Sequence, residues 1–320
     1  MGTRLGRLLV SEHLVLVLSL AVFLALVPLA PALARPENLA NLLSSLLPLL
    51  IVTAGQLLVL LTGGIDLSQT STIALASVTG AWVMSSSEGW LAGHPLAVPA
   101  ALAAMLLAGA VVGAFNGVAV ARLGLPAFVV TLTSTMFVSG LAVFLTRSRN
   151  VNGLPASFLA LGGRIPGALA LALAVAALVH LLLARSLYGR WLYAVGRNAV
   201  AARVSGVPVE GVTVAVYVAS GVLAALASVL YTAQAETGSP VLGQRLLLDV
   251  VGAAVIGGAS LTGGRGRLAG VAAGALFVKL LDNGLDLLSL SNFGVMMVKG
   301  GVILAAALVD AARTRVLARA

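Results

Sequence analysis

The sequence predicts an all-α, polytopic integral membrane protein with about ten transmembrane helices, some of them short or broken. Of the 320 residues, 60% are hydrophobic and only 9% are charged, and the mean hydropathy is +1.10. A soluble domain carries about 25% charged residues, so this chain has too few to cover a surface exposed to water. Its apolar segments are long and continuous, whereas the strands of a membrane barrel alternate over about ten residues.

Ten apolar segments predict the spanning helices, and most approach the roughly 20 residues that cross a bilayer core. In order they are residues 11–34, 39–62, 68–85, 96–121, 124–146, 165–183, 210–233, 247–261, 266–283 and 292–311. The first follows Arg4 and Arg7 but is too long for a signal-peptide core, so we interpret it as an uncleaved span. The segments 68–85 and 247–261 are short and predict broken or re-entrant helices. We treat residues 1–320 as a single transmembrane domain.

Two glycine ladders predict where helices pack closely. Small residues four apart lie on one helix face and let two backbones approach each other in lipid. The ladders are Gly109, Gly113 and Gly117 in the fourth segment, and Gly266, Gly270 and Gly274 near the ninth. We interpret both as packing surfaces and not as substrate sites.

The arginines predict the orientation of the chain. With the N-terminus inside, twelve arginines fall on the cytoplasmic side and five fall outside. Arg147 and Arg149, which are among the five outside, are the main exception to this bias. Cytoplasmic loops carry the excess of basic residues, so both termini are predicted to be cytoplasmic. The net charge of +9 indicates contact with anionic membrane lipid and gives no indication of nucleic-acid binding.

The stretch 186–207 interrupts the apolar pattern and predicts a short cationic helix outside the membrane. It carries Arg190 and Arg197, and it lacks an apolar run long enough to cross a bilayer. Asn198 is suited to cap a helix start, and Gly206 is suited to its end. The small residues of this stretch are Gly189, Gly196, Ala201, Ala202 and Gly206. The alternative is that its arginines only fix the topology.

Two stretches interrupt helices at membrane depth and are candidates for a translocation path or gate. In the first, Gly63 and Gly64 end a helix before Asp66, which is costly near lipid, and Ser68 is suited to cap the next helix. Asp66 either caps that helix at the water boundary, which we favour slightly, or contacts a substrate. The second stretch contributes Pro126, Phe128 and Thr131. Thr131 either lines the path or bonds its own backbone, and the second arrangement is commoner.

The remaining polar residues give no catalytic grouping. The glycine-rich stretch 257–266 lacks the lysine and spacing of a phosphate-binding loop, and the three histidines are scattered without metal-ligand spacing. The chain has no cysteine, which excludes disulfides. Lys279 and Lys299 are expected either to pair with Asp282 or Asp286 or to extend to a membrane interface.

Several motifs, in order, are those of one family. The chain resembles the permease (transmembrane) subunit of bacterial ABC sugar importers of the ribose/xylose/galactose type, within the branched-chain amino acid/ribose permease superfamily. Residues 63–68 match the family's Gly-Gly-Ile-Asp-Leu-Ser, and residues 256–266 match its Ile-Gly-Gly-x-Ser-Leu-x-Gly-Gly-x-Gly. Further matches are 125–132, 188–207, Lys299-Gly300 and Asp310. The chain departs from the family pattern at Thr133, Leu247 and Gly294, which leaves the identity of the sugar open.

The resemblance implies a division of labour among several chains. The loop 184–209 would be the cytoplasmic coupling segment that docks on a separate ABC ATPase subunit. That subunit would bind ATP and Mg, so this chain would bind no cofactor and would not be an enzyme. A periplasmic or lipid-anchored sugar-binding protein would deliver the substrate, and a second permease copy would complete a homodimeric or heterodimeric pore in the bacterial inner membrane. The implied coupling residues are Gly189, Arg190, Gly196, Arg197, Asn198, Ala201, Ala202 and Gly206. The implied path or gate residues are Gly63, Gly64, Asp66, Pro126, Phe128 and Thr131.

Other functions remain as alternatives. An ABC permease for nucleosides or branched-chain amino acids would share the style of the coupling loop. An ion-coupled secondary transporter would need a coupling-ion site and inverted repeats, and the sequence gives no convincing sign of either. A membrane-embedded enzyme would need a catalytic grouping, which the sequence does not indicate.

Overall fold

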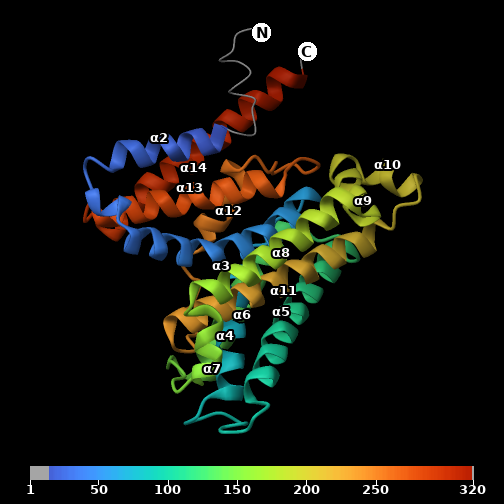
Figure 1. Ribbon diagram of the computed structural model, residues 1–320. Coiled ribbons are helices and arrows are strands. Elements are labelled where there is room, and N and C mark those ends of the chain that lie inside the picture. Colours follow the sequence, from blue (N-terminus) through green and yellow to red (C-terminus); the bar gives the residue numbers. More distant parts are fainter. Residues whose placement is uncertain (1–13, 319–320) are drawn as a thin grey trace.

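The computed structural model describes the backbone of residues 14–318 and the side chains of residues 14–308, and this part is all-α (Figure 1). Its one β-type pairing is an isolated bridge between Val151 and Gly238. Arg4, Arg7 and Asp310 lie outside the described side chains. The elements are α2 (Leu14–Leu26), η1 (Pro31–Ala34), α3 (Pro36–Leu61), α4 (Gln69–Met84), α5 (Ala97–Ala121), α6 (Ala127–Thr146), α7 (Ala156–Gly162), α8 (Ile165–Arg185), α9 (Leu187–Arg197), α10 (Ala199–Val204), α11 (Val209–Ala235), α12 (Leu247–Ile256), α13 (Leu268–Leu287) and α14 (Asn292–Ala318).

Every one of the ten predicted segments contains a helix, which confirms the polytopic all-α class. Among the described residues, six helices are long and apolar enough to cross a membrane, namely α3, α5, α6, α8, α11 and α13. α4 and α12 are short, as the sequence predicts, with 16 and 10 residues. The prediction of one continuous first span over 11–34 is wrong within the described residues. α2 ends at Leu26, before Pro28 and Pro31, because proline lacks the N–H that would continue a helix.

The short helix α4 lies at the centre of the bundle. Thirteen of its 16 residues are buried, including Gln69, Thr70, Ser71, Thr72 and Ser77. The neighbouring α3 and α11 are also largely buried, whereas α5, α6 and α8 expose most of their apolar surface. A helix enclosed by protein has no lipid-facing surface of its own, so polar residues are tolerated where their hydrogen bonds are met. This placement explains how α4 can carry several polar residues at the centre of the bundle.

The glycine ladders pack as predicted. On α5, β-carbons at Gly109 and Gly113 would overlap backbone carbonyls of α11, so the two helices touch backbone to backbone. On α13, Gly270 and Gly274 meet the carbonyls of Gly257 and Ala253 in the same way. Gly266 lies in the loop before α13 and takes φ +150°. Close approach of this kind is how helices associate in lipid without a hydrophobic driving force.

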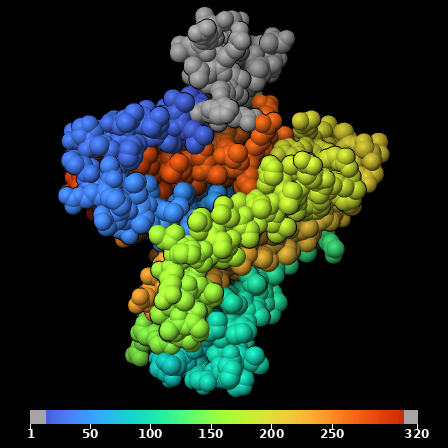
Figure 2. Space-filling model, in the orientation of Figure 1, coloured from blue at the N-terminus to red at the C-terminus, as the bar shows by residue number. Residues whose placement is uncertain are grey.

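The ends of several helices meet where α9 and α10 project from the molecule (Figures 1 and 2). α8 leads directly into α9, and α10 leads into the start of α11. α9 also packs on α3. The opposite ends carry α7 and the loops that the Val151–Gly238 bridge joins. The bundle therefore places the predicted coupling segment at one end and the loop between α4 and α5 at the other (Figure 1).

Candidate functional site

The predicted coupling segment folds as two helices, α9 and α10, and not as one. Ser186 caps the start of α9, and its Oγ accepts a hydrogen bond from the Gly189 N–H in the first turn. Tyr188 donates its hydroxyl to the Val212 carbonyl at 3.0 Å, and Tyr193 donates to the Gly266 carbonyl at 2.9 Å. Burial raises the pKa of Tyr188 to about 12, so this phenol keeps its proton at neutral pH. These bonds fasten α9 to α11 and to the loop before α13.

The second helix, α10, forms where the sequence predicts a capped helix. The Asn198 side-chain oxygen accepts a hydrogen bond from the Ala201 N–H at 2.9 Å, which satisfies a donor left unpaired at the helix start. Ala202 is buried, and its carbonyl accepts from the Val207 N–H at 3.0 Å. Gly206 takes φ +83°, which only glycine adopts readily, and so ends the helix.

Three glycine-containing stretches that are far apart in the sequence meet beside α9. The Gly264 N–H donates to the Leu61 carbonyl at 3.0 Å, and Gly196 lies directly against this hydrogen bond. A β-carbon on Gly196 would overlap the Leu61 oxygen. A β-carbon on Gly263 would lie 2.9 Å from both the Gly196 oxygen and the Gly63 Cα. α9, the end of α3 and the glycine-rich loop 257–266 therefore touch through backbone, with no side chain between them.

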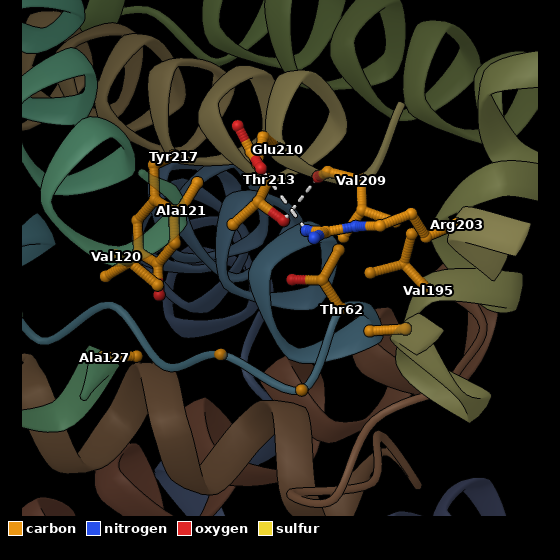
Figure 3. Close-up of a pocket in the computed structure, with 13 residues that line it drawn as sticks. Thr62, Val120, Ala121, Ala127, Val195, Arg203, Val209, Glu210, Thr213 and Tyr217 are labelled. Atoms are coloured by element: carbon orange, nitrogen blue, oxygen red, sulfur yellow. Dashed lines mark hydrogen bonds and ion pairs between the residues drawn. The ribbon is translucent and has the colours of Figure 1, made fainter. Parts of the chain in front are cut away.

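A cavity of about 320 Å³ opens between this junction and α10. Figure 3 shows Arg203 of α10 reaching across its mouth to Glu210 at the start of α11, at 3.3 Å. Both side chains are more than half exposed, so the pair adds little stability. Tyr217 lines the cavity opposite Thr62 (Figure 3), and Gly63 and Gly64 complete its wall. The cavity therefore leaves space into which neighbouring groups can move, beside the point where α3 ends.

The other predicted coupling residues divide between the surface and the interior. Arg190, Arg197 and Asn198 are exposed. Gly189 is buried, and a β-carbon there would overlap carbonyl oxygens of α8. Gly189 and Gly196 thus pack within their own chain, and Gly206 has open space around it.

Asp66 lies buried in the turn between α3 and α4. Its Oδ1 accepts from the Ser68 N–H at 3.0 Å and from the Ser68 hydroxyl at 2.6 Å, and its Oδ2 accepts from the Ser220 hydroxyl at 2.6 Å. Of the two interpretations of Asp66, a position at the water boundary is wrong, because its exposed fraction is 2%. Ser68 occupies the cap position of α4 but makes no side-chain cap bond, and its hydroxyl instead donates to Asp66 and accepts from the Asn116 amide.

Two chains of donors lead to this carboxylate from neighbouring helices. On one side, Ser134 of α6 donates to the Asn116 oxygen at 2.5 Å, and Asn116 of α5 donates to the Ser68 oxygen at 2.8 Å. On the other side, Gln69 of α4 donates to the Ser220 oxygen of α11 at 2.8 Å. Buried polar networks with their donors satisfied fix a unique arrangement. Asp66 therefore holds α4, α5, α6 and α11 in register beside the break.

The candidate path residues are only partly brought together. Thr131 is fully buried and donates to the Ala127 carbonyl at 2.9 Å, the commoner arrangement, and also to the Ile65 carbonyl at 3.2 Å. Asp66, Gly64 and Thr131 thus gather around residues 63–68. Phe128 is 55% exposed on the outside of α6 and does not join them. Pro126 is exposed and immediately precedes the first residue of α6.

Comparison with known proteins identifies the family. The family model "Branched-chain amino acid transport system / permease component" matches residues 38–307. The chain belongs to this permease family. It is similar to the Ribose import permease protein RbsC of Escherichia coli (strain K12), with 36% identity over 92% of each chain. No solved structure matches.

Further relatives cover most of the permease as well. The L-arabinose transport system permease protein AraH of Escherichia coli (strain K12) is 33% identical over 94% of this chain and 90% of its own. The Probable ABC transporter permease protein y4mJ of Sinorhizobium fredii (strain NBRC 101917 / NGR234) is 36% identical over 85% and 81%. The resemblance to permeases of ribose-type ABC importers is therefore confirmed.

Sequence reasoning missed two residues of the permease that the structure makes prominent. Val200 and Val204 lie four apart on α10 and are 75% and 85% exposed. Residues four apart share one helix face, so they form a small apolar face on a projecting helix. The signal was present in the sequence as two valines at helical spacing after the Asn198 cap.

Proposed function

We propose that this permease is the transmembrane subunit of an ABC importer that moves a monosaccharide into the cytoplasm. Its relatives include permeases named for ribose and for L-arabinose, and they match nearly the whole chain. A separate ATPase subunit would bind ATP and Mg and supply the energy. A sugar-binding protein and a second permease copy would complete the assembly in the bacterial inner membrane, with both permease termini in the cytoplasm.

The observation that carries the proposal is the backbone junction of Gly196, Leu61 and Gly264. Close-packed groups transmit displacement because they leave no space to absorb it. Movement of α9 would therefore reach the end of α3 and the loop 257–266 directly. Residues 63–68, which carry the Asp66 network, come directly after the end of α3 in the sequence, so this movement would reach them next. In this proposal ATPase closure pushes on 184–209, and the junction converts that push into rocking of the bundle.

The surface of α10 supports a protein partner on this side. Val200 and Val204 present an apolar face that an ATPase subunit would cover. Beside α10, Arg197 and Arg265 line a cleft together with Thr262, Gly263 and Gly264. Basic side chains at the rim of an interface attract an acidic partner surface and speed its approach. We expect the docking groove of the ATPase subunit to be apolar at its centre and acidic on this side.

The test replaces the apolar face and measures association. Val200→Ser with Val204→Ser should lower co-purification of the ATPase subunit by at least about tenfold, because burying one valine contributes roughly 1.5 kcal/mol and 1.4 kcal/mol is tenfold in an equilibrium constant. ATP-driven uptake of labelled ribose, arabinose, xylose or galactose should fall with it. The matched control is Leu123→Ser, which changes an apolar residue of similar exposure in the loop between α5 and α6.

The outcomes test the docking of the ATPase subunit and the class of substrate separately. Normal ATPase binding by the double variant would overturn the docking assignment. Uptake by the unaltered permease that needs an ion gradient, and neither ATP nor an ATPase subunit, would overturn the importer itself. Uptake of branched-chain amino acids or nucleosides in place of the four sugars would assign the permease to the alternative substrate class.

A further inference from the structure

Four charged side chains form a closed ring between α12, α13 and α14. Lys279 lies 3.2 Å from Asp249 and 3.4 Å from Asp282, and Lys299 lies 2.5 Å from Asp249 and 2.7 Å from Asp282. Acids and bases alternate around the ring, and the four charges sum to zero. The expected pairing with Asp282 is confirmed. Asp249 was not expected as a partner of these lysines, and Asp286 is exposed and lies outside the ring.

The ring is largely buried, which makes it costly. The Asp249 side chain is 4% exposed, and the other three are between 11% and 17% exposed. Buried ion pairs lose their hydration, so apolar side chains of similar volume often stabilise a fold equally well. Ionisable residues within membrane helices are for the same reason usually functional. Stability alone does not explain four charges at this place.

The ring joins α14 to the rest of the bundle. α14 packs on α12 and α13 with a face that carries Val295, Lys299 and Ile303, spaced four residues apart. Ile303 lies against Gly252 of α12. The opposite face is exposed, with Phe293, Met296, Met297 and Leu304. Lys299 is thus the polar link, beside a narrow apolar contact, through which α14 is attached.

A fifth group beside the ring lacks a partner in this arrangement. The hydroxyl of Tyr231, on α11, is buried and has no hydrogen-bond partner among the described residues. It lies within electrostatic range of the Asp249 and Asp282 carboxylates. A buried donor left unpaired is costly, so a movement that brings a free carboxylate within reach of this hydroxyl would be favoured by a new hydrogen bond. A carboxylate released by Lys299 would be the acceptor.

We propose that Asp249, Lys279, Asp282 and Lys299 form a charge lock that holds α14 on α12 and α13 and opens once in each transport cycle. When α14 withdraws Lys299, Tyr231 donates its hydroxyl to the carboxylate that is left. The five residues are positioning residues for the movement of α14. The proposal rests on the proposed transport function, but its test below has a readout that does not need transport.

The first experiment closes the lock covalently. The chain has no cysteine, and a β-carbon built on Gly252 lies 4.0 Å from the Ile303 Cβ, within the range that a disulfide spans. Gly252→Cys with Ile303→Cys therefore gives a bond between α12 and α14 that oxidant makes and reductant breaks. The reduced form of the same protein is the control. Disulfide yield is measured on the permease with its ATPase subunit, with and without ATP, and sugar uptake is measured in liposomes.

The expected result is loss of uptake on oxidation, recovery on reduction, and a lower disulfide yield with ATP because the lock then opens. Uptake by the oxidised protein equal to that of the reduced protein would overturn the lock. Where ATP lowers the disulfide yield but no form transports a sugar, the proposed transport function fails and the lock stands. A yield that ATP leaves unchanged counts against it.

The second experiment uses Tyr231→Phe, which removes only the unpaired hydroxyl. A purely structural role predicts unchanged or higher stability and unchanged uptake, because the hydroxyl makes no bond here. The lock predicts the same stability but about tenfold slower uptake, since the open arrangement loses a hydrogen bond to a charged group. Equal uptake by Tyr231→Phe and the unaltered permease would refute the role of the hydroxyl.

Discussion

At Gly196 the absence of a side chain determines how α9 meets the bundle. The Leu61 carbonyl oxygen occupies the space where a β-carbon would lie, so alanine requires α9 or α3 to shift. Gly196→Ala is expected to destabilise the permease by roughly 1–3 kcal/mol, the usual cost of overpacking, despite the better helix propensity of alanine. Gly211→Ala on α11 is the matched control, because no atom lies near its β-carbon position. Thermal unfolding in detergent measures both variants. Equal unfolding midpoints for Gly196→Ala and Gly211→Ala would contradict the tight packing at Gly196.

Single residues show how far the sequence could predict the site. Asn198 was identifiable as a cap because its type and position suffice for that bond. Gly196 was identifiable as unusual, but its contacts come from Leu61 and Gly264, and pairings of such sequence separation leave no local pattern. Asp66 was expected near water because its partner Ser220 is 154 residues away and leaves no local sign of a buried partner.

Among the elements, α14 offers a test of charge balance that needs no transport assay. Lys299→Met leaves two carboxylates with one lysine, and an unpaired buried charge typically costs 3–5 kcal/mol, so membrane insertion and thermal stability should fall. Adding Asp282→Asn restores neutrality around the remaining Asp249–Lys279 pair and should recover most of the loss. The control is Asp286→Asn on the exposed side of α13, where little change is expected. No recovery in the double variant would mean that the ring does not act as one neutral unit.

Helix positions were more predictable than helix roles. The apolar runs located α3, α5, α6, α8, α11 and α13 within a few residues, because a bilayer imposes a fixed length on each span. α9 was missed as a helix of its own because Gly189 and Gly196 weaken its propensity, and tertiary contacts compensate for them. The central place of α4 follows only from the surrounding helices.

For the whole molecule, the two ends of the bundle should face opposite sides of the membrane. α10 projects at one end, and the loop between α4 and α5 lies at the other (Figure 1). Val204 of α10 is 85% exposed, and Trp90 of that loop is 78% exposed. The excess of basic residues on the side of α10 predicts that this end is cytoplasmic. In the cysteine-free chain, Trp90→Cys should react with a membrane-impermeant maleimide in cells whose outer membrane alone is permeable. Val204→Cys should react only after the inner membrane is opened. The reverse pattern would place α10 outside the cell interior, where no ATPase subunit could reach it, and would remove the basis of the coupling assignment.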